Sequence, residues 1–110
     1  MKYKENMDNE CIPLCDAINK FKGITTTESC CGHGNRPFNI WFKTKRLSRL
    51  PKLLFYFDSC HSGIAGWDVI VTTDCSIAPV SFRVQSKSMG ERAYKQANKI
   101  AELMIKALEE

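Results

Sequence analysis

Residues 25 to 38 read TTTESCCGHGNRPF, a stretch that brings two thiols, an imidazole and a guanidinium close together. Three kinds of chemistry use such groups. Cysteine and histidine side chains hold zinc, a thiol beside a base can act as a nucleophile, and a glycine-rich backbone can bring its N–H groups up to a phosphate. This stretch is therefore the first place to look for a functional site.

A zinc site has enough candidate ligands but not the usual spacing. The candidates are Cys30, Cys31, His33, Cys60, His61 and Cys75. Structural zinc needs four ligands in a tetrahedral array, and these residues include no Cys-x-x-Cys pair and no His pair at finger spacing. Adjacent residues of an extended chain point to opposite faces, so Cys30 and Cys31 could not easily share an ion. We therefore expect no metal and no other cofactor.

A catalytic thiol is the second interpretation. Cys30 or Cys31 could be activated by His33 and Arg36, because a base or a positive field lowers the pKa of a thiol. No carboxylate that could orient the imidazole is visible in this stretch, and free cysteine is among the most frequently buried residues. We expect one of the two cysteines in the core, assign no catalytic residue, and favour a protein that is not an enzyme.

An anion-binding turn uses more of the unusual features. Gly32 and Gly34 can adopt positive φ and present N–H groups to a phosphate, Arg36 can add a bidentate contact, and Trp41 or Trp67 can stack on a base. A plain glycine-rich hairpin is the alternative. The predicted ligand-binding residues are Thr27, Ser29, Cys30, Cys31, Gly32, His33, Gly34, Arg36, Trp41 and Trp67.

Composition and length predict one globular domain over residues 1–110. Hydrophobic residues make up 44% of the chain and charged residues 25%, which is ordinary for a folded domain. No apolar run reaches the roughly 18 residues that span a membrane, and the N-terminus lacks the apolar core of a secretory signal. We expect a cytoplasmic protein with no membrane partner, whose six cysteines are reduced.

The net charge of +4 is unevenly distributed. No acidic residue lies between Glu28 and Asp58, whereas the same window holds Arg36, Lys43, Lys45, Arg46, Arg49 and Lys52. A basic block of this kind favours an anionic partner, although a solvated basic face is an equally good explanation.

The elements that must position these groups follow from periodicity and capping signals. Helices are predicted at about 10–22, where Asn9 or Asp8 can cap, from Ser48 onward, and at about 89–108, where Ser88 and Glu91 have capping-box spacing. Strands are predicted in ITTTESC, PFNIWFK, WDVIVTT and PVSFRV. In PFNIWFK the apolar residues alternate, which places Trp41 on the face opposite Phe38, Ile40 and Phe42.

This element order, α-β-β-α-β-β-α, predicts an α+β domain. Four mainly antiparallel strands would form one sheet packed by helices. TTTESC with PFNIWF has a faint counterpart in TTDC with PVSFRV, so the two halves could be an internal duplication. A free sheet face carrying Trp41 and Arg83 would suit a ligand or a second subunit.

Two family resemblances bear on function. LCDAINKFKGITTTESCCGHG resembles the opening of the wybutosine-synthesising tRNA methyltransferase family, in which an Ile-Asn pair precedes a Thr-Thr-Ser-Ser-Cys-Ser-Gly-Arg stretch. The matching residues here are Ile18, Asn19, Thr26, Thr27, Ser29, Cys30 and Gly32. This resemblance implies an enzyme that modifies a nucleotide or RNA.

The whole chain also resembles a group of small proteins common in phages and bacterial mobile elements, with a TT-x-SC-x-GHG motif. The matching segments are residues 26–34, 37–42, 67–71 and 94–108. The resemblance implies a role in the host cytoplasm, where small phage proteins counter host defence and some sequester nucleotide signals.

We therefore expect a homodimer or larger homo-oligomer that binds a phosphorylated or nucleotide ligand. One alternative is the nucleotide- or RNA-modifying enzyme. The other is an interaction module that docks an acidic protein on the basic window from Arg36 to Lys52.

Overall fold

The structure is a computed structural model, and it describes residues 7–58, 66–72 and 80–109. The helices are α1 (Ile12–Asn19), α2 (Leu50–Leu54) and α4 (Glu91–Glu109), and the strands are β1 (Ile24–Cys30), β2 (Pro37–Thr44), β3 (Asp68–Val71) and β4 (Val80–Met89). Short 3₁₀ turns are η1 (Asn9–Cys11), η2 (Gly32–Gly34), η3 (Leu47–Arg49) and η4 (Phe55–Phe57). The α+β prediction is confirmed.

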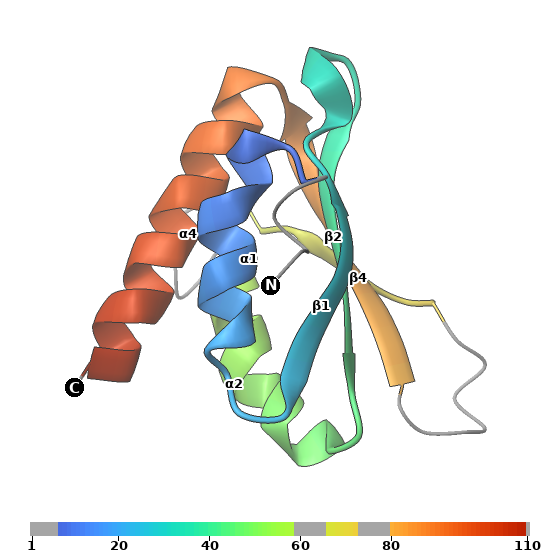
Figure 1. The fold of residues 1–110 in the computed structure, drawn as a ribbon. Helices are drawn as coiled ribbons and strands as arrows, with labels where there is room; N and C mark the ends of the chain where they lie inside the picture. Colours follow the sequence, from blue (N-terminus) through green and yellow to red (C-terminus); the bar gives the residue numbers. More distant parts are fainter. Residues whose placement is uncertain (1–6, 59–65, 73–79, 110) are drawn as a thin grey trace.

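The four strands form one antiparallel sheet in the order β1-β2-β4-β3. Helices α1 and α4 lie side by side against one face, and no described helix covers the other (Figure 1). Phe38, Ile40 and Phe42 of β2 are fully buried under the helices. Trp41, between them in sequence, lies on the uncovered face, as the alternation predicted.

The β1–β2 hairpin contains a bulge that Asn19 holds in place. The pairing shifts between Thr26, opposite Phe42, and Glu28, opposite Trp41, so that Thr27 is the extra residue. Asn19, at the end of α1, accepts a hydrogen bond from the Thr26 N–H and donates one to the Thr26 hydroxyl, both at 2.8 Å. The bulge thereby ties the helix to the strand that follows it.

The boundary between β4 and α4 differs from the prediction. Ser88 does not cap the helix, because β4 continues to Met89 and α4 begins at Glu91, after Gly90 at φ 63°. Ser86 holds this end of the strand, since its hydroxyl accepts from the Phe38 N–H at 2.8 Å and donates to the Ser88 carbonyl at 2.6 Å.

Other helices are shorter than predicted. Instead of one helix over 10–22, the chain forms η1 and then α1, with Pro13 in the first turn. The predicted second helix is divided into η3, α2 and η4, and Ser48 lies inside η3 instead of capping it. None of the described helices is long and apolar enough to cross a membrane.

Strand pairing repeats between the two hairpins, with PFNIWF matching PVSFRV as predicted but with TTTESC matching residues 67–72 instead of TTDC. Trp41 of β2 lies directly opposite Arg83 of β4. These two positions are 42 residues apart. Adding 42 to both members of the cross-strand pair Glu28–Trp41 in the first hairpin gives Ile70–Arg83, which is a cross-strand pair in the second. From Glu28 and Ile70 onward the two hairpins thus share one register, related by an approximate two-fold axis that passes between Trp41 and Arg83, whereas the bulge offsets the pairing of Thr26 by one residue.

Candidate functional site

The Cys31–Gly34 turn has the backbone conformation that its glycines predicted. Gly32 and Gly34 have φ values of 82° and 88°. A Cβ atom on Gly32 would lie 2.8 Å from the Pro37 carbonyl oxygen, so the turn has no room for a side chain there. His33 is also left-handed, at φ 53° and ψ 30°, which is uncommon for a residue with a side chain.

The N–H groups of this turn are largely used within the protein. Asn35 and Arg36 both donate to the Gly32 carbonyl at 3.1 Å, and the His33 N–H donates to the Cys31 sulfur at 3.4 Å. The Cys31 N–H donates to Asp8 Oδ2 at 3.0 Å. A carboxylate therefore occupies a position that a phosphate would need, which weakens the case for an anion-binding turn.

Asp8, Cys31 and His33 form a cluster at this end of the sheet. One donor atom from each lies within 4.8 Å of the other two, and the Cys31 sulfur is 3.8 Å from His33 Nδ1. Cys31 is buried, Asp8 half-buried and His33 exposed. We call these three residues the Asp8–Cys31–His33 cluster.

The cluster has perturbed acidities. The hydrogen bond from the Cys31 N–H lowers the pKa of Asp8 and outweighs the effect of burial. Burial raises the pKa of Cys31. The interaction of the Cys31 side chain with Tyr94 of α4 is the main reason that the pKa of Tyr94 is raised. The Cys31 thiol is therefore protonated near neutral pH, a poor state for a nucleophile.

The predicted site residues do not form one surface. Cys31, Gly32, His33 and Gly34 lie together in the turn. Ser29 faces the helix-covered side of the sheet, where it lowers the pKa of the buried thiols Cys11 and Cys15 and partly offsets the effect of burial. The remaining residues of the segment lie elsewhere: Thr27 is exposed at the bulge, Arg36 is exposed beyond the turn, and Cys30 lies beside Asn39.

Trp67 does not have the predicted ligand-stacking position. It immediately precedes β3, is only 5% exposed, and packs between the rings of Phe38 and Phe57 at centroid distances of 5.5 and 5.6 Å. Its indole N–H donates to Gln96 Oε1 at 3.1 Å. Trp67 is therefore a core residue, packed between the sheet, η4 and α4.

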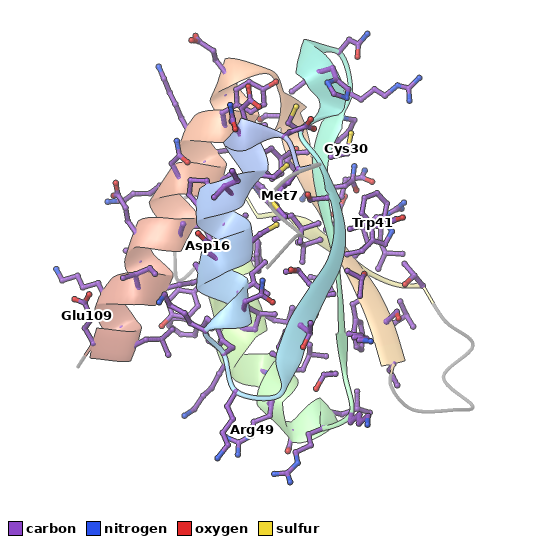
Figure 2. The ribbon with its side chains drawn as sticks, in the orientation of Figure 1. Met7, Asp16, Cys30, Trp41, Arg49 and Glu109 are labelled. Atoms are coloured by element: carbon purple, nitrogen blue, oxygen red, sulfur yellow. The ribbon has the colours of Figure 1, made fainter. Side chains whose placement is uncertain are left out.

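Trp41 occupies the centre of the uncovered sheet face (Figure 2). The Arg83 guanidinium carbon lies 5.7 Å from the Trp41 ring centroid, within cation–π range. Asn39 Oδ1 and Arg83 Nε are shielded from solvent and have no hydrogen-bond partner among the described residues. Such atoms cost free energy until a partner is supplied, so this face is a candidate for ligand binding.

A basic pocket lies at the end of the sheet where β2 ends. Its volume is about 280 Å³, and it is lined by Gly23, Thr25, Lys43, Thr44, Lys45 and Arg46. Lys43 lies two residues after Trp41 and therefore projects from the same face of β2. Three of the lining residues, Lys43, Lys45 and Arg46, belong to the predicted basic window.

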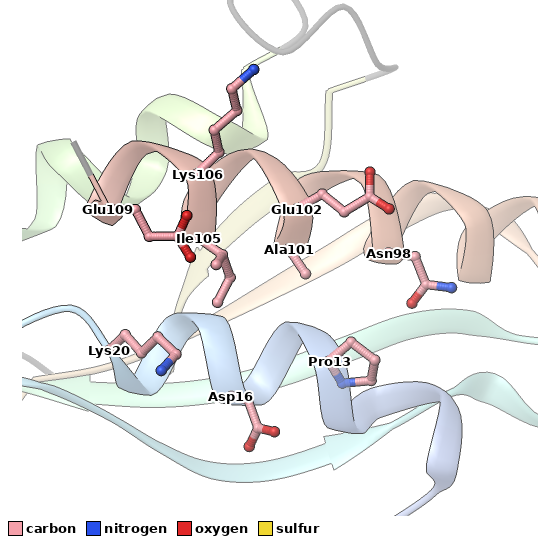
Figure 3. A pocket seen from close by; sticks show the side chains of 9 residues that line it. All are labelled: Pro13, Asp16, Lys20, Asn98, Ala101, Glu102, Ile105, Lys106 and Glu109. Carbon is pink, nitrogen blue, oxygen red and sulfur yellow. The ribbon is translucent and has the colours of Figure 1, made fainter.

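A second groove lies between α1 and α4 (Figure 3). Ala101 and Ile105 of α4 point toward α1, and both acidic and basic side chains line the rim, among them Asp16, Lys20 and Glu102. This mixture of charges selects no class of ligand.

Sequence reasoning missed Asp8 and underused Asn39. Asp8 was expected to cap a helix, but its side chain makes no cap hydrogen bond and instead reaches Cys31, 23 residues later. Only tertiary structure reveals that contact. Asn39 could have been found, because alternation along β2 places it beside Trp41.

Four described cysteines, Cys11, Cys15, Cys30 and Cys31, are free thiols. Cys60, His61 and Cys75 lie outside the described residues. No protein family, curated protein or solved structure was found to match the chain.

Proposed function

We propose that the protein binds a nucleotide on the uncovered sheet face. The observation that carries the proposal is that Lys43, which lines the basic pocket together with Lys45 and Arg46, projects from the same sheet face as the Trp41–Arg83 pair. An aromatic platform beside a cationic pocket supplies the two contacts that a nucleoside phosphate needs.

Trp41 would provide the surface for the base. Stacking of a base on an aromatic side chain contributes about 1–3 kcal/mol, and an arginine beside the ring adds a cation–π contact. Glu28, directly opposite Trp41 on β1, is exposed and can accept from an amino group of the base. Rotation of Asn39 and Arg83 on binding would give their unpaired atoms hydrogen-bond partners.

The phosphate would lie in the basic pocket. Two residues along a strand span about 7 Å, so Lys43 and Trp41 are separated by a distance that one nucleoside phosphate bridges. Lys45 and Arg46 add positive charge at the same place. The resemblance to small phage proteins suggests that binding would sequester a nucleotide signal without altering it.

The test uses the Trp41 fluorescence of the full chain, which has only two tryptophans. Ribonucleoside monophosphates and triphosphates, inorganic phosphate and an oligouridine are titrated in turn. We expect quenching by a nucleotide, and none in a Trp41→Phe variant, which keeps the buried Trp67 as an internal reference. Lys43→Gln should weaken binding about tenfold, the loss of one charge-assisted contact.

Lys95→Gln is the matched control, because it removes the same charge from the exposed surface of α4. Mass spectrometry of the recovered ligand decides between binding and catalysis. An altered nucleotide would favour the modifying enzyme, and tighter binding of oligouridine than of any mononucleotide would make RNA the ligand. Binding of an acidic polypeptide with no nucleotide binding would overturn the proposal in favour of a docking module.

A further inference from the structure

The Asp8–Cys31–His33 cluster has no part in the proposed nucleotide site, yet it contains three strong metal-ligating groups. We propose that Asp8, Cys31 and His33 bind a divalent transition-metal ion, with Zn²⁺ as the expected occupant. This inference goes beyond the proposed function and does not depend on it, since Trp41 and Lys43 contribute nothing to the cluster.

The separations of the donor atoms suit a tetrahedral ion. Zn–S and Zn–N bonds of about 2.3 and 2.05 Å place the two ligand atoms roughly 3.5 Å apart at a tetrahedral angle. Cys31 Sγ and His33 Nδ1 are 3.8 Å apart. All three donor atoms lie within 4.8 Å of one another, so small side-chain rotations bring them to bonding distance of one point.

The arrangement is convergent, which distinguishes it from a catalytic relay. In a Cys-His-Asp relay the imidazole lies between the other two groups, and the carboxylate and sulfur are then roughly 7–8 Å apart. Here the Asp8 carboxylate is within 4.8 Å of the Cys31 sulfur and even accepts the Cys31 N–H. A metal ion requires ligand atoms that converge on one point, and this cluster meets that requirement.

The turn holds its ligands in advance. His33 has a left-handed backbone conformation, which is uncommon for a residue with a side chain. Its N–H donates to the Cys31 sulfur, and this hydrogen bond keeps the imidazole on the same side of the turn as the thiol. The Asp8 carboxylate is fixed through the Cys31 N–H and retains a free oxygen lone pair for a metal. Tyr94 of α4 lies close enough to Cys31 for the two groups to shift each other's pKa, so its hydroxyl can form a hydrogen bond with the sulfur. Hydrogen bonds of this kind commonly orient metal ligands.

The ligand types select the metal. A thiolate and an imidazole favour zinc and similar ions over magnesium or calcium, which prefer oxygen ligands. One thiolate and one carboxylate balance the charge of a divalent ion. Three protein ligands leave one tetrahedral position open, and because His33 is exposed, water or an external ligand can reach it. The sequence did not predict this site because Asp8 precedes Cys31 by 23 residues, and only the fold brings the two together.

The test is titration of the full, metal-stripped chain with Co²⁺, a coloured substitute for Zn²⁺. We expect one equivalent to produce the intense visible bands of tetrahedral cobalt together with a thiolate charge-transfer band, both abolished by added Zn²⁺. Cys31→Ser should remove the charge-transfer band and weaken binding more than about 100-fold. Cys30→Ser is the matched control, since it changes the neighbouring thiol, which lies outside the cluster.

Two further variants keep the test decisive if Cys31→Ser folds poorly. His33→Asn removes a ligand while keeping a residue that tolerates the left-handed backbone, and it should weaken binding at least tenfold. Tyr94→Phe should weaken it about tenfold, the effect expected when a supporting hydrogen bond is lost. Unchanged cobalt spectra in Cys31→Ser and His33→Asn, or no tetrahedral spectrum in the wild type, would overturn the proposal. Trp41→Phe should leave the spectrum intact, which separates this result from the nucleotide test.

Discussion

At the scale of single residues, adjacent residues have different surroundings, because side chains in extended or tightly turned chain point in different directions. Cys30 and Cys31 are adjacent, yet Cys30 lies beside Asn39 in the sheet and Cys31 is buried at its end. Residue types identified the segment, but they could not show that Asp8 reaches it. That contact depends on how η1 packs against the turn.

Gly32 and Gly34 provide a matched test of this turn. Both have positive φ, so alanine is strained at each. At Gly32 the new Cβ would also meet the Pro37 carbonyl at 2.8 Å, whereas nothing lies within 4 Å at Gly34. We expect Gly34→Ala to lower the free energy of unfolding by about 1 kcal/mol and Gly32→Ala by about 2–4 kcal/mol. Urea denaturation measures both, and equal losses would contradict the steric argument.

The buried thiols make a second prediction. Burial raises the pKa of Cys11 to about 12 and that of Cys15 to about 11, from the ordinary value of 9.0. Few thiolates form at these positions in mildly alkaline solution, so iodoacetamide should label Cys30, which is partly exposed, well before Cys11 or Cys15. Peptide mapping by mass spectrometry follows each site. Rapid labelling of Cys15 in the folded protein would contradict its position in the core.

The same pKa values fix the sign of a stability change. The unfolded chain loses its thiol protons near pH 9, while the folded protein keeps them to about pH 11–12. The folded state then holds more protons, so this contribution to stability is complete below pH 9 and is lost as the pH rises through that window. Cys15→Ala should make the alkaline loss shallower.

At the scale of elements, local signals predicted which segments are helices and strands, whereas tertiary pairing set their ends. Ser88 with Glu91 is a good capping signal, but pairing of Met89 with Pro37 keeps Ser88 in β4. Trp67 lies at strand-like spacing before Val69, and packing against Phe38 and Phe57 draws it into the core. Alternation in β2 was reliable because one side of that strand faces the helices and the other does not.

The bulge in β1 makes the element-scale prediction. Asn19→Ala removes two hydrogen bonds and leaves the Thr26 N–H without its acceptor. We expect the free energy of unfolding to fall by about 1–3 kcal/mol, with faster amide exchange at Thr26. Asn98→Ala, on the exposed surface of α4, is the control and should be neutral or slightly stabilising. Equal stability of the two variants would show that the bulge forms without Asn19.

At the scale of the whole molecule, the two hairpins explain why one sheet face carries a Trp–Arg pair at its centre. Residues on an approximate two-fold axis face their own counterparts, so a repeat places positions 41 and 83 opposite each other. The sequence suggested the repeat only faintly, because the residues at matching positions, such as Trp41 and Arg83, differ. The two helices differ in length, since α2 spans Leu50–Leu54 whereas α1 spans Ile12–Asn19.

This symmetry predicts that Trp41 and Arg83 can exchange places. Trp41→Arg alone and Arg83→Trp alone each lose the cation–π contact, worth about 1 kcal/mol at a half-buried site. In the double variant the contact is restored. Arginine at position 41 then lies opposite Glu28, and tryptophan at position 83 lies opposite Ile70, so both new neighbours are favourable.

A double-mutant cycle in urea measures the coupling. We expect the double variant to be more stable than the sum of the single losses implies, by about 1 kcal/mol. A control exchange of Asn39 with Arg83, which are not related by the axis, should show no such recovery. If the Trp41–Arg83 exchange and the Asn39–Arg83 exchange both lose stability additively, positions 41 and 83 are not equivalent. The two hairpins would then share only their pattern of strand pairing.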